Sequence, residues 1–418
     1  MKPRLLVVPE IPKAADAASS GVKRYLWSLF SLLQRSLAID DVDLSSCNPD
    51  EEIVRNQEKV QAEAQGIRSV PRTKLIYRSI LRKFGILRFI PGYLKELIGT
   101  YRQIRAKGDG FDLIHVNRVG CEVQPIAARL AGIRPVVTTV HNLPGTDAAA
   151  QHWFRRWVEK LSFAAADLHI CVSEATYQAW QKRIGLKRDR CLVVLNGVQE
   201  SSVAINRQEA RRLLEVAEDV VAVGILARIH PMKGHEVLFY AWKQLIEKST
   251  VNCKLYVIGD GPIRKSLQEQ VERMGLAETI AFLGHREDGP ELLWGIDIAV
   301  LPSIMLETFG YSISEAMFAG IPSVVSDMGG MKEYILPSEG GKVVTAGDPD
   351  ALADALLAYI DNPELRKNDG QKAREYALAN LTAERMAKET LKAYAMACEI
   401  VERHDIAKAF NDITIPSR

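Results

Sequence analysis

The sequence predicts an α/β protein with two doubly wound domains. Short apolar runs recur between helix-length segments, and a polar stretch divides ten such runs into two groups of five. Near-continuous apolar strands of this kind are typical of parallel sheets that helices cover on both faces. At 418 residues the chain is long enough for two or three domains, since one domain takes about 150 residues.

The first five runs predict the strands of an N-terminal domain, residues 1–200: RLLVVPE, DLIHV, PVVTTVH, LHICVS and CLVVLN. The next five predict the strands of a C-terminal domain, residues 201–384: VVAVGILAR, KLYVIGDG, TIAFLGH, IDIAVLPS and PSVVSD. The polar stretch NGVQESSVAINRQEARR lies between the two groups. The sequence predicts a helix near the end of the chain, and Thr382 is a candidate N-cap for this helix.

Composition narrows the class of protein. The chain is 47% apolar and 25% charged with a formal net charge of +2, which fits a globular protein and does not favour a general nucleic-acid binder. Six cysteines occur without a C-x-x-C pair, so neither a zinc ribbon nor a disulfide framework is indicated. The start, MKPRLLVVPEIP, has too short an apolar run for a signal peptide. We expect a cytoplasmic protein.

Two glutamates in the stretch LETFGYSISEAMFAG raise the first functional question. Glu315 has a structural explanation, because Ser312 and Glu315 form an S-x-x-E capping box. Glu307 lies in a strand-to-helix loop, where binding groups concentrate. In open parallel sheets ligands bind beyond the carboxyl ends of strands, and Gly310 would let backbone approach a phosphate there.

The stretch GILARIHPMKG supplies two cations. Arg228 and Lys233 follow a predicted strand of the same sheet, so both can point at one polyanion, such as a diphosphate. The alternative is a pair of solvated surface cations. His141, at the end of the run PVVTTVH, is a further candidate, although a lone histidine is more often a packing or surface residue.

Together these features resemble the retaining glycosyltransferases of family 4, which have the GT-B fold. The landmarks that carry the resemblance are, in order, GILARIHPMKG, LYVIGDGP, AFLGH, DIAVLPS, ETFGYSISEAMFAGIPSVVSDMGGMKEYI and GDPDALADAL. The first half matches more loosely, through SSGVKRYLWSL, FDLIHVN, VVTTVHN, ADLHICVSE and VLNGV. The resemblance implies two Rossmann-like domains that face each other across a cleft, with a C-terminal helix, residues 385–418, crossing back to the first.

The resemblance also assigns roles to residues. Glu307 and Glu315 match the family's E-x7-E motif, in which the first glutamate lies against the donor sugar and the second binds the ribose hydroxyls. Arg228 and Lys233 match the pair that neutralises the donor diphosphate. Arg286 occupies a position whose backbone contacts the base.

Further positions carry over from the family. Phe309, Gly310 and Tyr311 match the loop whose backbone meets sugar and phosphate. His141 matches a histidine that reaches the donor sugar from the opposite domain, and Gly21 matches the glycine-rich loop after the first strand, beside the diphosphate. Domain closure would then assemble the site and exclude water.

The implied reaction is retaining transfer of a sugar, a hexose, from a nucleotide-diphosphate donor, with no metal and no other cofactor. No cluster of His and Asp has the spacing of metal ligands. One departure concerns the sugar: Thr308 stands where the family usually has glycine, which bears on hexose preference. We expect catalysis to depend on Glu307, His141, Arg228 and Lys233.

A basic segment, residues 66–107, bears on the acceptor. It holds eleven cations interleaved with aliphatic and aromatic residues against one acid, Glu96; the cations are Arg68, Arg72, Lys74, Arg78, Arg82, Lys83, Arg88, Lys95, Arg102, Arg105 and Lys107. Such a segment can lie on an anionic membrane, bind an anionic acceptor, or pack as an amphipathic helix with a solvated basic face. Nucleic-acid binding is not favoured, because no recognition module is present.

The favoured acceptor is a membrane-borne glycolipid or a precursor of an envelope polysaccharide or lipopolysaccharide, reached from the cytoplasmic face of the membrane. Two alternatives stay open. The same fold and donor can serve a soluble small-molecule acceptor, or the chain can be a non-catalytic scaffold that binds nucleotide sugar or membrane.

Overall fold

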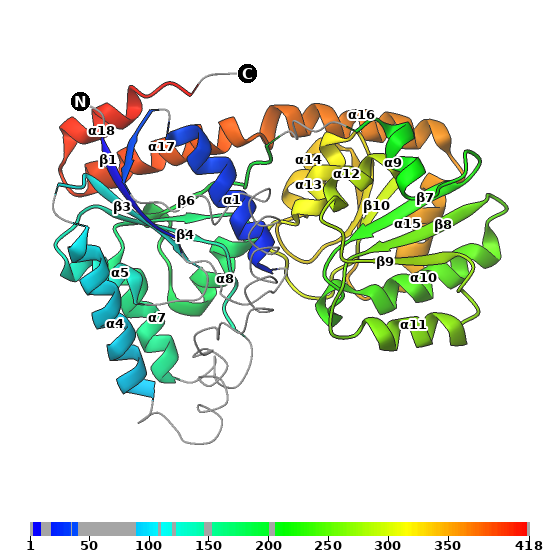
Figure 1. The fold of residues 1–418 in the computed structure, drawn as a ribbon, viewed down its shortest axis with the longest axis horizontal. Coiled ribbons are helices and arrows are strands. Elements are labelled where there is room, and N and C mark those ends of the chain that lie inside the picture. The colour runs from blue at the N-terminus through cyan, green and yellow to red at the C-terminus, as the bar shows by residue number, and fades with distance from the viewer. Residues whose placement is uncertain are drawn as a thin grey trace, which may run out of the picture. The chain divides into compact units, whose positions relative to one another are not determined.

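The computed structural model divides the chain into two compact units (Figure 1). Unit 1 comprises Met1–Gly197 and Ala383–Arg418, and unit 2 comprises Val198–Thr382. The structure describes residues 3–9, 18–34, 36–40, 89–107, 110–118, 123–145, 153–199 and 205–415. Each unit contains one wholly parallel sheet between layers of helices, which confirms the predicted α/β class with two doubly wound sheets.

The sheet of unit 1 has the order β2-β1-β3-β4-β5-β6. Every neighbouring pair is parallel. The strands are β1 (Arg4–Pro9), β2 (Ala38–Asp40), β3 (Leu113–Arg118), β4 (Val136–Val140), β5 (Leu168–Cys171) and β6 (Cys191–Val193). All residues of β4 and β5 are buried, as expected for strands with helices on both faces.

The sheet of unit 2 has the order β12-β11-β10-β7-β8-β9 and is also parallel throughout. The strands are β7 (Val221–Leu226), β8 (Cys253–Ile258), β9 (Ile280–Gly284), β10 (Ile298–Leu301), β11 (Ser323–Ser326) and β12 (Gly341–Val344). All ten predicted runs therefore form strands. The sequence did not predict β2 and β12, which are short strands at sheet edges and lack long apolar runs.

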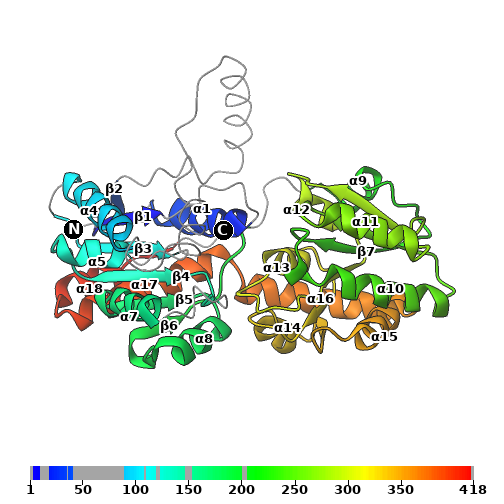
Figure 2. The ribbon, with the colours of Figure 1, turned by 90° about the horizontal axis from the view of Figure 1, so that it is seen from below.

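Helices cover both faces of the first sheet. α4, α5, α7 and α8 form one layer, and α1 packs with α17 on the other face (Figure 1). The helices of unit 1 are α1 (Ala18–Leu33), α4 (Phe89–Ala106), α5 (Gln124–Leu130), α7 (Trp153–Ala165), α8 (Glu174–Ile184), α17 (Ala383–Ile400) and α18 (His404–Asn411). Figure 2 shows α5 between α4 and α7, and it contacts both.

In unit 2, α10 contacts α11 and α15, whereas α16 packs on α13 and α14. The helices are α9 (Arg207–Leu213), α10 (His235–Lys248), α11 (Arg264–Arg273), α12 (Gly289–Leu292), α13 (Tyr311–Phe318), α14 (Lys332–Ser338), α15 (Pro349–Ile360) and α16 (Pro363–Asn380). Local capping residues begin several of them: the Asp348 side chain accepts hydrogen bonds at the start of α15, and that of Asn362 does so at α16.

The last two helices complete the core of unit 1. Tyr394 and Phe410 are buried there, and the Tyr394 hydroxyl lies 2.6 Å from Nδ1 of His115 on β3. The Arg403 guanidinium donates to the Asp112 carboxylate at 2.8 Å. None of the described helices is both long and apolar enough to span a membrane.

His115 connects three elements of this core. Its Nε2 lies 2.7 Å from the Thr139 hydroxyl on β4, and that hydroxyl lies 3.0 Å from the hydroxyl of Tyr25 on α1. The histidine is fully buried, and this burial lowers its pKa to about 3. The ring therefore stays neutral in the folded protein at physiological pH.

We predict a pH-dependent contribution of His115 to stability. Below about pH 6.5 the unfolded chain binds a proton at this imidazole that the folded chain does not, so the free energy of unfolding falls as pH falls, by about 1.4 kcal/mol per pH unit. His115→Gln should remove that part of the slope between pH 6 and pH 4. Urea unfolding at several pH values measures it, and parallel profiles for the two proteins would contradict it.

Candidate functional site

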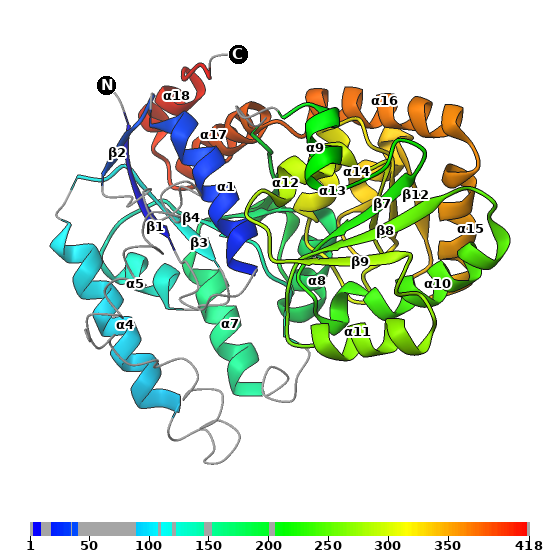
Figure 3. The same cartoon turned by 45° about the vertical axis from the view of Figure 1, so that its right-hand side comes forward.

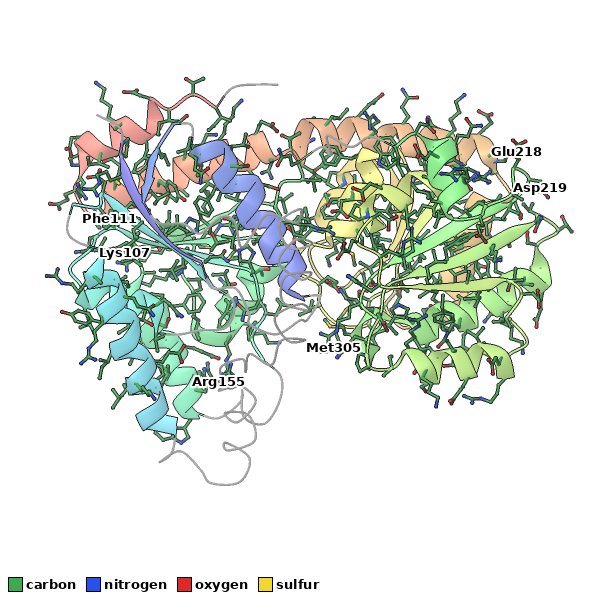
Figure 4. The ribbon with its side chains drawn as sticks, in the orientation of Figure 1. Lys107, Phe111, Arg155, Glu218, Asp219 and Met305 are labelled. Carbon is green, nitrogen blue, oxygen red and sulfur yellow. The ribbon has the colours of Figure 1, made fainter. Side chains whose placement is uncertain are left out.

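Two neighbouring strands of unit 2 place the predicted cations and a glutamate at one sheet edge. The sheet runs one way from β7 through β8 and β9, and the other way through β10, β11 and β12. This reversal is the topological switch point at which open α/β sheets bind ligands. Arg228 and Lys233 follow β7, and Glu307 follows β10. Figure 4 labels Met305 in the loop after β10, and Glu218 and Asp219 at the opposite end of the sheet.

Lys233 and Glu307 form an ion pair, joined by Lys233 Nζ and Glu307 Oε1. Their side chains are only 19% and 11% exposed. The buried Ser303 hydroxyl donates to the same carboxylate oxygen at 3.0 Å. The carboxylate is therefore oriented through one oxygen, and its charge is balanced by the lysine.

Backbone contact holds the two loops together. The Ile304 N–H donates to the Met232 carbonyl at 2.9 Å. Gly234 has a φ of +73°, and a Cβ at this position would lie 1.9 Å from the Pro302 carbonyl oxygen. Glycine is therefore required for the approach that brings Lys233 beside the loop of Glu307.

The backbone of Glu307 is fixed from its other side by the turn after β11. Its N–H donates to the Met328 carbonyl at 3.1 Å, and its carbonyl accepts from the Gly330 N–H at 2.8 Å. Gly329 lies between these contacts with a φ of +100°, and a Cβ there would lie 2.0 Å from the Glu307 carbonyl oxygen. These two backbone hydrogen bonds and the close approach of Gly329 form what we call the cradle around Glu307. It requires glycine at position 329.

The loop that leads into α13 is also anchored. The buried Tyr334 hydroxyl donates to the Phe309 carbonyl at 2.7 Å and to the Gly310 carbonyl at 3.1 Å. Phe309 is buried with its ring 5.1 Å from that of Tyr311. Gly310 caps α13 with a φ of +83°. This arrangement presents the N-terminus of an eight-residue helix at the same sheet edge.

The capping-box explanation of Glu315 is wrong. The N-cap of α13 is Gly310, and it makes no side-chain capping bond. Because Gly310 takes the left-handed conformation, the helix begins at Tyr311 and Ser312 is already inside it. Glu315 therefore lies in the second turn, half-buried, where a capping role does not account for it.

The other predicted residues of unit 2 lie along the same edge. Arg228 is half-buried, and the next residue, Ile229, donates its N–H to the Asp260 carbonyl at 2.9 Å, which ties this loop to the one after β8. Arg286 follows β9, and its guanidinium makes two hydrogen bonds to Asp288, at 2.7 and 2.6 Å. This contact holds the pKa of the Asp288 carboxyl below its usual value.

Two predicted residues belong to unit 1. His141 follows β4, and its Nε2 lies 2.6 Å from Oδ1 of Asn117 at the end of β3. Burial, with a smaller effect of His115, lowers the pKa of His141 to about 3. The ring is thus neutral, with Nε2 donating to Asn117 and Nδ1 left as a hydrogen-bond acceptor.

The Tyr25 ring fixes the orientation of His141 edge-on, at 4.4 Å between ring centroids. Gly21 was expected in a loop and lies instead in the first turn of α1. The structure therefore corrects the local conformation of Gly21, which stands at the beginning of the helix after β1.

Sequence reasoning missed several residues at these positions: Ser303, Gly329, Tyr334, Asn117 and His235. Gly329 and Tyr334 lie inside the landmark DMGGMKEYI, so their place in the motif was the available signal. His235 is buried beside Lys233, and burial lowers its pKa to about 4. Among the described residues, neither of its ring nitrogens has a hydrogen-bond partner.

The basic segment is only partly described. Residues 66–88 lie outside the described residues, so the predictions for that part have no structural counterpart here. Residues 89–106 form α4, which packs on the core of unit 1 through Leu97 and Ile104. Lys95, Arg102 and Arg105 lie exposed on the helix.

The carboxyl ends of the strands of unit 2 form an edge of the sheet that can bind an anion. Two cations follow β7, and the first N–H groups of α13 add positive partial charge. Glycines let backbone approach closely at the same loops. A phosphate-bearing ligand with a polar group near Glu307 fits this chemistry.

Comparisons with known proteins show which families and structures the chain is similar to. The family profile described as "Glycosyl transferases group 1" matches residues 206–376, and the profile described as "Glycosyltransferase Family 4" matches residues 19–202. The UDP-Gal:alpha-D-GlcNAc-diphosphoundecaprenol alpha-1,3-galactosyltransferase of Escherichia coli is 27% identical over 65% of this chain and 72% of its own length.

A second relative, the phosphatidyl-myo-inositol mannosyltransferase of Mycobacterium leprae, is 30% identical over 62% of this chain and 66% of its own length. The crystal structure of Anabaena HepE in complex with UDP and glucose is similar in fold, with a TM-score of 0.65 at 20% identity over 93% of this chain and 98% of HepE. At that identity the likeness shows the GT-B fold alone.

We predict that Gly329→Ala destabilises unit 2 more than Gly347→Ala. Both glycines have positive φ, so both variants carry backbone strain of about 1 kcal/mol. Only at position 329 does the new Cβ meet backbone, and the overlap should add about 2 kcal/mol or displace Glu307 from Lys233. Urea unfolding measures both variants, and equal losses would contradict the cradle around Glu307.

Proposed function

The chain belongs to the glycosyltransferases of group 1 and family 4, and on that premise we propose that it is a retaining hexosyltransferase. It moves a sugar from a nucleotide-diphosphate donor to a membrane-borne acceptor in the synthesis of an envelope polysaccharide or lipopolysaccharide. The ion pair of Lys233 and Glu307 at the switch point of unit 2 carries this proposal.

The donor diphosphate binds where positive charge is already in place. Lys233 and Arg228 lie after β7, and the N-terminus of α13 lies after β10. Charge develops on the diphosphate as the anomeric bond breaks, and preorganised cations and N–H groups stabilise it. In this proposal Arg286 contributes backbone to the base, Glu315 binds the ribose, and the loop of Phe309, Gly310 and Tyr311 meets sugar and phosphate.

Glu307 orients the sugar rather than attacking it. Its Oε1 already accepts hydrogen bonds from Lys233 and Ser303, so the remaining oxygen is aimed by contacts that also reduce its nucleophilicity. The acceptor hydroxyl attacks the face from which the diphosphate leaves, and its proton passes to the departing phosphate. Configuration is then retained without a covalent glycosyl-enzyme.

His141 supports this step as a neutral group. Its Nε2–H is committed to Asn117, so Nδ1 is the atom that accepts a hydrogen bond from a hydroxyl of the donor sugar. Gly21, at the start of α1, belongs beside the diphosphate. We propose that closure of the two units assembles these groups with those of unit 2 and excludes water.

The reaction needs no metal and no other cofactor in this proposal. Arg228, Lys233 and the helix N-terminus supply the positive charge that a divalent cation supplies elsewhere to a leaving diphosphate. Thr308 lies next to Glu307, where a hydroxyl bears on the choice of hexose.

The acceptor is proposed from the names of two relatives. One is named for a diphosphoundecaprenol acceptor and the other for phosphatidyl-myo-inositol, and both are lipids. The chain would then work at the cytoplasmic face of a membrane, as a peripheral protein. The first relative is named for UDP-Gal, so UDP-hexoses are the first donors to test.

We predict that one nucleotide sugar raises the melting temperature and is slowly hydrolysed without acceptor. A panel of UDP-, GDP-, ADP- and dTDP-sugars, with and without anionic liposomes, measures both effects. Glu307→Gln and Lys233→Met should keep the fold and lower turnover at least a hundredfold, the scale for loss of one preorganised electrostatic contact.

Lys248→Met is the matched control for Lys233→Met. Lys248 is at the far end of α10, paired with Asp354 at 3.6 Å, so this variant also loses a lysine ion pair but not at the switch point. It should turn over donor normally. Normal turnover in Lys233→Met would remove the ion pair from the site, and tight binding of a donor that is never turned over would favour the scaffold.

A further inference from the structure

Helix α7 exposes a row of large apolar side chains. Trp153, Trp157 and Leu161 are 69%, 52% and 42% exposed. They are spaced four residues apart, so they share one side of the helix. Arg156 and Lys160 are exposed beside them. Trp153, Trp157 and these two cations also line a surface hollow of about 440 Å³.

The other side of α7 packs inside unit 1. Val158, Ser162 and Phe163 on this side are buried. Glu159, also buried, accepts hydrogen bonds from Arg155 at 3.3 Å and Arg183 at 2.8 Å. The one acid of this helix is therefore neutralised inside the unit, so its outer side presents cations and apolar groups.

Helix α4 repeats this arrangement. Leu94 and Ile98 are each 48% exposed, and Tyr101 follows one turn later with 36% exposed. The exposed charged residues from the start of α4 to the residue just after it are four cations and one acid: Lys95, Arg102, Arg105, Lys107 and Glu96. The inner side of α4 already packs on the core, so these apolar side chains are not needed for it.

The two helices point the same way. Both pack on α5, and in Figures 1 and 3 their N-terminal ends extend in one direction beyond the sheet of unit 1. In Figure 4, Arg155 lies at that end of α7, whereas Lys107 lies at the opposite end of α4. Trp153, the first residue of α7, and Leu94, in the second turn of α4, thus both belong to the N-terminal halves that extend at this end of the unit.

We propose that this α4–α7 face docks on an anionic lipid bilayer. The face consists of the exposed residues Leu94, Lys95, Ile98, Tyr101, Arg102, Arg105, Trp153, Arg156, Trp157, Lys160 and Leu161. Tryptophan and tyrosine favour the boundary between acyl chains and headgroups, and the cations attract anionic headgroups.

Its composition favours lipid over a protein partner. Charged residues are depleted at the cores of protein interfaces, whereas here cations alternate along both helices with exposed apolar side chains. The charge is also one-sided, with six cations against Glu96 over α4, Lys107 and the outer side of α7. Docking gives the proposed function a route to a membrane-borne acceptor, but it does not depend on the chemistry of the transfer.

The test measures binding of the full chain to vesicles, without any sugar transfer. Vesicles of phosphatidylcholine and phosphatidylglycerol in a 3:1 ratio should sediment the protein, pure phosphatidylcholine vesicles should bind it at least tenfold more weakly, and salt should weaken the anionic binding. Trp153→Ser/Trp157→Ser should lower the partition constant at least tenfold. Arg156→Gln/Lys160→Gln should lower it severalfold and flatten the salt dependence.

Tyr240→Ser/Lys243→Gln is the matched control. It removes an exposed aromatic and an exposed cation from α10 of unit 2, and it should bind vesicles as the wild type does. Brominated lipids provide a second readout, since they should quench tryptophan fluorescence in the wild type and much less in the double tryptophan variant. Equal melting temperatures check that all variants fold.

Two outcomes would overturn the docking face: no binding of the wild type to anionic vesicles, or equal binding of the wild type and the double tryptophan variant. In the first of these cases, binding to an anionic glycan in solution would point to an acceptor site on this face instead. Failure of the proposed function looks different, because the vesicle result would hold while no nucleotide sugar changed the melting temperature.

Discussion

Direct backbone contact between neighbouring strand-to-helix loops is the constraint on which the site in unit 2 depends. Gly234 lets the loop after β7 touch the loop after β10, and Gly329 lets the turn after β11 touch Glu307 on both sides. Side chains at these glycines would separate the loops by more than a hydrogen bond can span. Lys233 and Glu307, 74 residues apart in sequence, meet because of these contacts rather than through any local preference.

The ion pair itself is a weak source of stability. Removing two charges from water costs several kcal/mol per ion, and the mutual attraction of the pair rarely exceeds that cost. A mostly buried pair at the switch point of a sheet is therefore better explained by function than by folding. Ser303 strengthens this reading, since its hydroxyl orients the same carboxylate oxygen without adding charge. A diphosphate near Lys233 would find its cation already desolvated and positioned.

Strands that are buried on both faces of a sheet could be predicted from the sequence. Helix starts, side-chain pairs and exposed helix sides that depend on tertiary contacts could not. Ten strands could be found because parallel strands are near-continuous apolar runs, while β2 (Ala38–Asp40) and β12 (Gly341–Val344) are short edges without that signature. The capping box failed because Gly310, at positive φ, starts α13 before Ser312. The pairing of Asn117 with His141, and the side of α7 that is exposed, follow from packing that periodicity alone does not specify.

The two units differ in how far apart in the sequence their folding contacts lie. Unit 2 is one contiguous stretch, Val198–Thr382, so all of its strands and the loops of its site are available together. Unit 1 is closed by helices from the end of the chain: Tyr394 meets His115 across 279 residues, and Arg403 meets Asp112 across 291. Such contacts carry a higher loop-closure entropy than the shorter-range contacts of unit 2, by about 0.6 kcal/mol for each doubling of loop length. The core that holds His115 therefore cannot be complete until the last helices are present, and unit 1 is the one whose stability is sensitive to the C-terminal helices.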